Sequence, residues 1–107
     1  MVKRVPVIVK SHHGPLKLLA KAKKQNFNLI LQNTPKIAHA IKTLFKLILN
    51  PKGPLEANQT KKLRKHKQFI RKVAHADNKK VVPTVQKGGS IFKTILGIAL
   101  PLLSGLL

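Results

Sequence analysis

The clearest hydrophobic pattern in the chain lies between residues 35 and 49. Apolar side chains recur there at helical spacing and form one continuous stripe, with lysines on the other faces. The stripe consists of Ile37, Ile41, Leu44, Phe45 and Ile48. Thr34 and Pro35 precede it as a helix-start signal, because a hydroxyl can accept a first-turn N–H bond and proline is tolerated at the first helical position. We predict a central core helix over 35–49, ended by the segment NPKGP.

Two further helices are predicted, one on each side of this central helix. Pro15 begins a weaker helical pattern over 15–31, which fades around residues 24–26. One kinked helix and two short helices both fit this segment. A helix over 57–75 is very basic but keeps an apolar edge around Ile70. The sequence therefore predicts a small all-α fold of three or four short helices.

The N-terminal segment, residues 1–14, is predicted to be a flexible basic arm because it is terminal and charged. It lacks the long apolar region and the small-residue cleavage site of a secretory signal, which indicates a cytosolic or nuclear destination. His12 and His13 have no acidic or cysteine companions, so we expect an exposed pair rather than a metal site.

The C-terminal segment, residues 90–107, reads SIFKTILGIALPLLSGLL and carries one charge, Lys93. Its length is barely enough to span a bilayer, and Pro101 would kink a helix there. We therefore expect a separate hydrophobic helix at residues 90–106 that lies in the membrane interface, rather than a transmembrane anchor. The competing interpretation is a core helix that packs on the central stripe. Membrane contact is preferred because the segment is apolar on nearly every side. The residues expected to contact a membrane are Ile91, Phe92, Ile95, Leu96, Ile98, Leu100, Leu102, Leu103 and Leu106.

The chain changes character at Gln86-Lys87-Gly88-Gly89-Ser90, with basic sequence before it and apolar sequence after it. Residues 77–89 are predicted to be a flexible linker between a basic helical domain, 15–76, and the tail. From the residues alone, the glycine pair is typical of an ordinary hinge.

The charge balance bears most directly on function. The chain holds 22 Lys and Arg against 2 Asp and Glu, a formal net charge of +20. Such an excess repels itself and indicates a polyanionic partner, either nucleic acid or an anionic membrane. There is no cysteine, and the two carboxylates, Glu56 and Asp77, are far apart in the sequence. With so few groups available for acid–base or metal chemistry, we expect no enzymatic activity and no cofactor.

The helix over 57–75 and the start of the linker carry the densest positive charge. Repulsion at i, i+4 would destabilise such a helix alone, and a polyanion would relieve it. Lysine outnumbers arginine, which favours non-specific, salt-dependent contacts with phosphates. The sequence shows no aromatic platform on which single-stranded bases could stack, so double-stranded DNA is the expected ligand. The net charge could neutralise roughly ten base pairs. The residues expected to contact nucleic acid are Lys61, Lys62, Arg64, Lys65, Lys67, Arg71, Lys72, Lys79 and Lys80.

The order of these features resembles the small basic proteins encoded by Polinton (Maverick) elements and adintovirus-like genomes. The resemblance runs from residue 18 to the C-terminus and is carried by LLAKAKKQNF, then IKTLFKLILNPKGPLEANQTKKLRKHKQFIRKVA, then VQKGG and the apolar tail. Those proteins are in turn similar to the adenovirus core-peptide precursor, a basic DNA-condensing protein whose apolar C-terminal part is clipped during maturation. The resemblance implies a DNA-condensing virion core protein, present in the host nucleus during assembly, with capsid proteins as further partners.

The same resemblance gives the glycine pair a second interpretation. Adenovirus-type maturation proteases favour an aliphatic residue, then any residue, then two glycines, and cut after the second glycine. The chain fits this frame except at Gln86, where an aliphatic residue is commoner, so the expected cut follows Gly89. Glycines can enter a narrow slot and Pro83 favours an extended approach. Cleavage by a viral maturation protease would release the tail, whereas a hinge would keep the two halves together.

Two functions of other classes remain open. The uncleaved tail could anchor a basic interaction protein to anionic membranes. The tail also resembles short lytic peptides, which would make the chain a host-defence peptide precursor, although the missing secretory signal argues against this.

Overall fold

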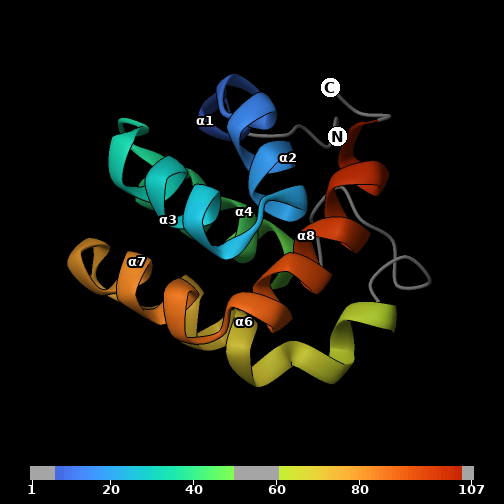
Figure 1. Cartoon of the computed structure of the whole chain (residues 1–107). Coiled ribbons are helices and arrows are strands. Elements are labelled where there is room, and N and C mark those ends of the chain that lie inside the picture. The colour runs from blue at the N-terminus through green and yellow to red at the C-terminus, as the bar shows by residue number, and fades with distance from the viewer. Residues whose placement is uncertain (1–6, 50–60, 105–107) are drawn as a thin grey trace.

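The computed structural model describes residues 7–49 and 61–104, with side chains to residue 101. Within these ranges the chain forms seven α-helices and one 3₁₀ helix, with no strand, so the predicted all-α fold class is confirmed (Figure 1). The elements are α1 (Val7–Ser11), α2 (His13–Lys21), α3 (Lys24–Asn33), α4 (Ile37–Leu49), η1 (Lys61–His66), α6 (Lys67–Ala74), α7 (Asn78–Lys87) and α8 (Gly89–Ser104).

Helix α4 lies at the centre of the core, as its apolar stripe predicts. All five residues of the stripe are buried, together with Ala40 and Leu47. The helix starts two residues later than predicted, because Thr34, Pro35 and Lys36 form a turn. Lys36 has a φ of 60°, a left-handed conformation that is unfavourable for a residue with a side chain.

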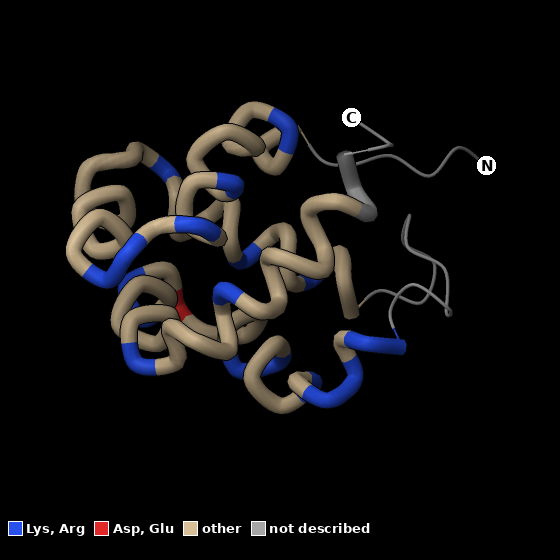
Figure 2. The backbone as a smooth tube through the Cα atoms, turned by 45° about the vertical axis from the view of Figure 1, so that its right-hand side comes forward, with Lys and Arg blue, Asp and Glu red and all other residues tan. Residues whose placement is uncertain are grey.

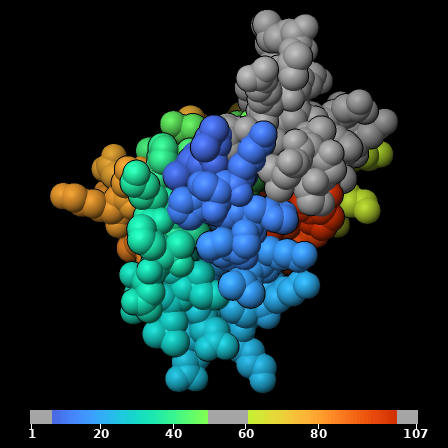
Figure 3. Space-filling view, turned by 90° about the horizontal axis from the view of Figure 1, so that it is seen from above, coloured from blue at the N-terminus to red at the C-terminus, as the bar shows by residue number. Residues whose placement is uncertain are grey.

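Residues 15–31 fold into two short helices, one of the two arrangements that fit the sequence. α2 and α3 are separated at Ala22 and Lys23, whose ψ angles of 145° and 159° are extended. Leu16 and Leu19 of α2 face the core, and so does Phe27 of α3. In the space-filling view, α2 lies between α3 and α8 on one side of the molecule (Figure 3).

The first part of the chain differs from the flexible arm expected there. Residues 7–11 form α1, and residues 1–6 lie outside the described part of the chain. Val9 is 1% exposed, so a single buried valine attaches this short helix to the core. The His12 ring adds two polar contacts, from Nδ1 to the Ile8 carbonyl at 2.9 Å and from Nε2 to the Pro35 carbonyl at 2.8 Å. His12 is therefore half-buried and structural, rather than one of an exposed pair.

The basic segment predicted as a helix over 57–75 is described from residue 61. It begins as the 3₁₀ helix η1 and continues as α6, while the expected helix start, at residues 57–60, lies outside the described residues. Leu63, Ile70 and Val73 form its buried edge, as the sequence indicates.

Residues 78–87, expected to be part of a flexible linker, form helix α7. Val81 and Val85 are fully buried and attach α7 to the core, while Pro83 lies on its exposed face. Pro83 is the sixth of the ten residues of α7, beyond the first turn, so its missing N–H costs the helix one internal hydrogen bond. The segment that was expected to separate two parts of the chain is therefore continuous with one core.

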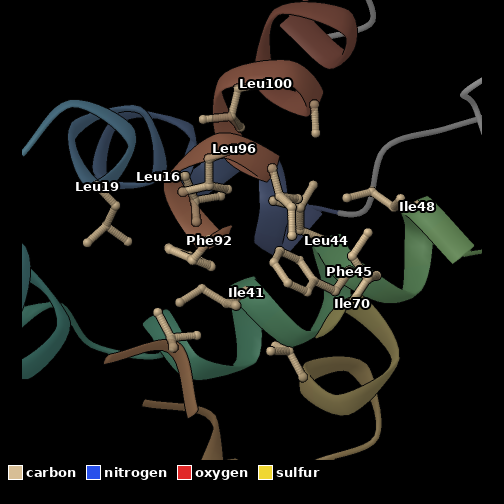
Figure 4. Close-up of a cluster of buried hydrophobic side chains, with 14 of the residues drawn as sticks. Leu16, Leu19, Ile41, Leu44, Phe45, Ile48, Ile70, Phe92, Leu96 and Leu100 are labelled. Atoms are coloured by element: carbon tan, nitrogen blue, oxygen red, sulfur yellow. The ribbon is translucent and has the colours of Figure 1, made fainter. Parts of the chain in front are cut away.

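Helix α8 is part of this core rather than a separate tail. Phe92, Ile95, Leu96 and Ala99 are fully buried, and Leu100 is 5% exposed. Figure 4 shows Phe92, Leu96 and Leu100 pointing toward the side chains of α2 and α4. The apolar segment therefore packs in the core, and the expected membrane helix over 90–106 is not the arrangement that the structure shows.

The four phenylalanines of the chain form a connected series through the core. Phe27 of α3 meets Phe92 of α8 edge-on, with ring centroids 5.7 Å apart. Phe92 lies 5.6 Å from Phe45 of α4, and Phe45 lies 6.3 Å from Phe69 of α6, again edge-on. Aromatic pairs at these separations contribute beyond their buried area. The series joins four helices and places α8 in contact with the centre of the domain.

Candidate nucleic-acid interface

The basic side chains of η1 and α6 project away from the core because the apolar residues of the same segment are anchored in it. Leu63, Ile70, Val73 and Ala74 recur on one side and are buried. The lysines and arginines of the same segment are all exposed: Lys61, Lys62, Arg64, Lys65, Lys67, Arg71 and Lys72. The same periodicity that forms the core contact therefore produces a basic outer face.

Helix α7 extends this basic face at its N-terminal end. Lys79 and Lys80 are exposed, and they follow α6 after a short turn. All nine residues predicted to contact nucleic acid thus lie on the surface, on η1, α6 and α7. We call this surface the basic face.

Negative charge is almost absent from the described part of the chain. Asp77, exposed in the turn before α7, is the one acidic side chain there, because Glu56 lies outside the described residues. Figure 2 shows this single acidic position among basic positions that occur on every described helix. No internal partner can neutralise so many cations, so their counterions must come from solvent or from a polyanion.

The predicted cleavage segment is folded. α7 ends at Lys87 and α8 begins at Gly89, with Gly88 between them. The Gly88 N–H donates to the Thr84 carbonyl at 3.1 Å, and the Gly88 carbonyl accepts from the Phe92 N–H at 2.8 Å. Gly88 also packs tightly on the Phe69 ring, which leaves no room for a Cβ. The extended approach expected from Pro83 is not present, because Gln86 and Lys87 are helical and Ser90 is already in the first turn of α8.

The residues predicted to contact a membrane are divided between core and surface. Phe92, Ile95, Leu96 and Leu100 are buried, Ile98 is partly buried, and Ile91 is 40% exposed. Leu102, Leu103 and Leu106 lie outside the residues whose side chains are described. No described helix combines the length and the apolar character needed to cross a bilayer.

Histidine and carboxylate side chains do not gather into a metal site in the described ranges. The His12 ring is engaged by backbone carbonyls, as described above. Its neighbour His13 is half-buried.

Two lysine-lined pockets at the α7–α8 turn were not predicted from the sequence. Lys87 lines both pockets, together with Lys72 and Lys80 in one and Lys24 and Lys93 in the other. Lys24 and Lys93 are far from α6 in the sequence, and only the packing of α3 against α7 and α8 brings them together. Charge density along the chain therefore gives no signal for this part of the surface.

Comparison of the chain with protein-family models, curated proteins and solved structures yields no match.

Proposed function

We propose that this protein binds double-stranded DNA through its phosphates, without reading base sequence, and compacts it. The observation that supports this proposal is the basic face, in which nine cationic side chains are exposed on three consecutive elements with one carboxylate nearby. Lysine and arginine on such a surface release condensed counterions when they meet phosphates. The resulting affinity falls steeply as salt concentration rises.

The aromatic residues favour duplex over single-stranded nucleic acid as the ligand. Single-strand binding proteins place exposed aromatic rings where bases can stack. Here Phe27, Phe45 and Phe92 are buried, and Phe69 is half-buried against Phe45. With its rings packed in the core, the protein offers charge without stacking, which suits the continuous phosphate backbone of a duplex.

Compaction requires contact with more than one DNA segment, and the distribution of lysines supports this. α1 and α2 lie at the top of Figure 1, while η1 and α6 lie at the bottom. Lys10 of α1 and Lys17 of α2 are exposed, so both sides of the molecule are positively charged. A duplex on the basic face leaves the other side free to attract a second duplex.

A pair of matched double variants tests this function. Replacement of Arg64 and Lys65 by Gln removes two charges from the basic face, and replacement of the exposed Lys36 and Lys46 by Gln removes two charges outside both proposed DNA-contacting sides. For a short random-sequence duplex, the first variant is expected to reduce the slope of log K against log salt by about 2, because each lost phosphate contact contributes about 0.9. The second variant should keep the slope near that of the wild type. Equal slopes for all three proteins would contradict the proposal.

The wider role follows from the resemblance to Polinton-type basic proteins. We place the protein in a virion, where it would condense packaged DNA next to capsid proteins, and in the host nucleus during assembly. Its detection in purified particles together with packaged DNA would support this location, and its absence from them would contradict it.

Release of α8 to act on membranes carries a large energetic cost. Full burial of an apolar side chain contributes about 1.5–3 kcal/mol, so exposure of Phe92, Ile95, Leu96 and Leu100 costs roughly 6–12 kcal/mol. This is comparable to the total stability of a small domain. Membrane activity of the tail, and protease cleavage after Gly89, would therefore have to accompany unfolding of the domain.

A further inference from the structure

The first pocket at the α7–α8 turn lies between α6 and α7. It has a volume of about 440 Å³ and is lined by Lys72, Lys80 and Lys87, with Thr84 and the Phe69 ring completing its wall. Lys72 comes from α6 and the other two lysines come from α7. We call it the α6–α7 pocket.

The second pocket lies on the other side of the same turn and is called the α3–α8 pocket. It has a volume of about 400 Å³ and is lined by Lys24, Lys87 and Lys93, with Asn28 and Ser90 as neutral polar groups. The Lys93 Nζ atom lies 5.3 Å from the centroid of the Phe27 ring, within the range of a cation–π interaction.

A side-chain contact helps to hold the α3–α8 pocket together. Gln86 Nε2 of α7 donates to Asn28 Oδ1 of α3 at 3.3 Å, which joins two helices that are distant in the sequence. Gly88, between the two pockets, lies against Phe69, so the turn itself is packed. The lysines therefore project from a surface with a defined backbone.

The chemistry of both pockets points to an anion. Five lysines from four helices converge on one turn, and none of the residues that line the pockets is acidic. Ammonium groups that line the same pocket repel one another, and a bound anion replaces that repulsion by attraction. The hydroxyl groups of Thr84 and Ser90 can donate hydrogen bonds to the same ligand.

We propose that the α7–α8 turn is a second phosphate-contacting surface of the protein, in which the two pockets hold phosphates of one DNA backbone and Lys87 lies between them. This inference rests on the proposed DNA-binding function and extends its interface. Lys72 and Lys80 already belong to the basic face, so the surface continues from α6 over the turn to Lys24 and Lys93. That continuity favours a polymeric phosphate ligand over an isolated one.

The test is a double variant in which Lys24 and Lys87 are replaced by Gln. Both side chains are exposed and have no role in the core, so the unfolding midpoint should be unchanged. Against a short random-sequence duplex at about 0.1 M salt, affinity is expected to fall by roughly 10- to 60-fold, because two counterion-releasing contacts are lost. The Lys36 and Lys46 double variant serves as the control with the same net charge.

The outcomes separate this inference from the function on which it rests. In one outcome the wild type binds DNA, the Arg64 and Lys65 variant binds more weakly, and the Lys24 and Lys87 variant binds like the control. The proposal that the α7–α8 turn contacts phosphates is then wrong, while the proposal for the basic face is supported. If the wild type does not bind the duplex, both proposals fail.

A second arm uses phosphatidylcholine vesicles with and without phosphatidic acid. If the Lys24 and Lys87 variant loses affinity for vesicles that contain phosphatidic acid but keeps its affinity for DNA, the pockets bind lipid headgroups and the inference is overturned. Loss of DNA affinity in the turn variant but not in the control supports it.

Discussion

Gly88 and Gly89 are neighbours in the sequence, but the same substitution should affect them in opposite directions. A Cβ added at residue 88 would lie 2.8 Å from Phe69 Cζ and closer still to Cε1. A Cβ added at residue 89 meets nothing within 4 Å, and neither glycine has a positive φ. Only Gly88 is therefore required for close packing.

The difference in stability between the two alanine variants depends on which side chain must move to make room for the added Cβ. The Phe69 ring is the obstacle, and it is held edge-on against Phe45, so relief of the clash disturbs an aromatic contact in the core. Overpacking of this kind costs about 1–3 kcal/mol, so Gly88→Ala should destabilise the protein by that amount. Gly89→Ala should be neutral or stabilise by up to about 1 kcal/mol, because alanine restricts the unfolded chain at no steric cost.

Thermal unfolding followed by far-ultraviolet circular dichroism measures both variants. At roughly 4 °C per kcal/mol for a domain of this size, the Tm of Gly89→Ala should exceed that of Gly88→Ala by about 4–16 °C. In a Phe69→Leu background, which removes the obstructing ring, the cost of Gly88→Ala should shrink. Equal Tm values for the two alanine variants would refute the packing argument and favour a glycine pair that serves only as a hinge.

Three further predictions concern the core and its turns. Phe92→Ala should cost about 3–5 kcal/mol in urea unfolding, and a cost no larger than that of Ile91→Ala would contradict the placement of α8 in the core. Lys36→Gly should raise stability by about 1 kcal/mol by removing left-handed strain, so a lower unfolding midpoint would argue against the turn before α4. His12→Ala should cost about 1 kcal/mol through its two carbonyl contacts, more than His13→Ala, and equal midpoints would contradict that role.

Much of the helical core was predictable from periodicity. The stripe of α4 and the buried edge around Ile70 follow helical spacing closely, and both are buried as expected. The exposure of the nine basic residues on η1, α6 and α7 follows from the same spacing, because burial of the apolar side of each helix turns its basic side toward solvent.

The placement of α8 was not predictable because its apolar residues suit a membrane and a protein core equally well. Which partner it contacts depends on how much apolar surface the other helices leave uncovered. α7 was missed for a related reason, since Pro83 and the glycine pair are typical of a linker, while the burial of Val81 and Val85 is decided by tertiary packing.

The pockets at the α7–α8 turn depend on contacts between distant segments. Lys24 reaches the turn only because α3 packs beside α7, where Gln86 bonds to Asn28. No local pattern in the sequence encodes that contact.

The central claim is that the exposed cations of this protein bind duplex DNA through phosphates alone. The most direct measurement is the affinity of the full chain for several unrelated duplexes between about 50 and 200 mM salt. If six or more cations contact phosphates, affinity should fall by about 10³-fold or more across this range, with the same slope for every sequence. An affinity that changes little with salt, or that differs strongly between sequences, would contradict the claim.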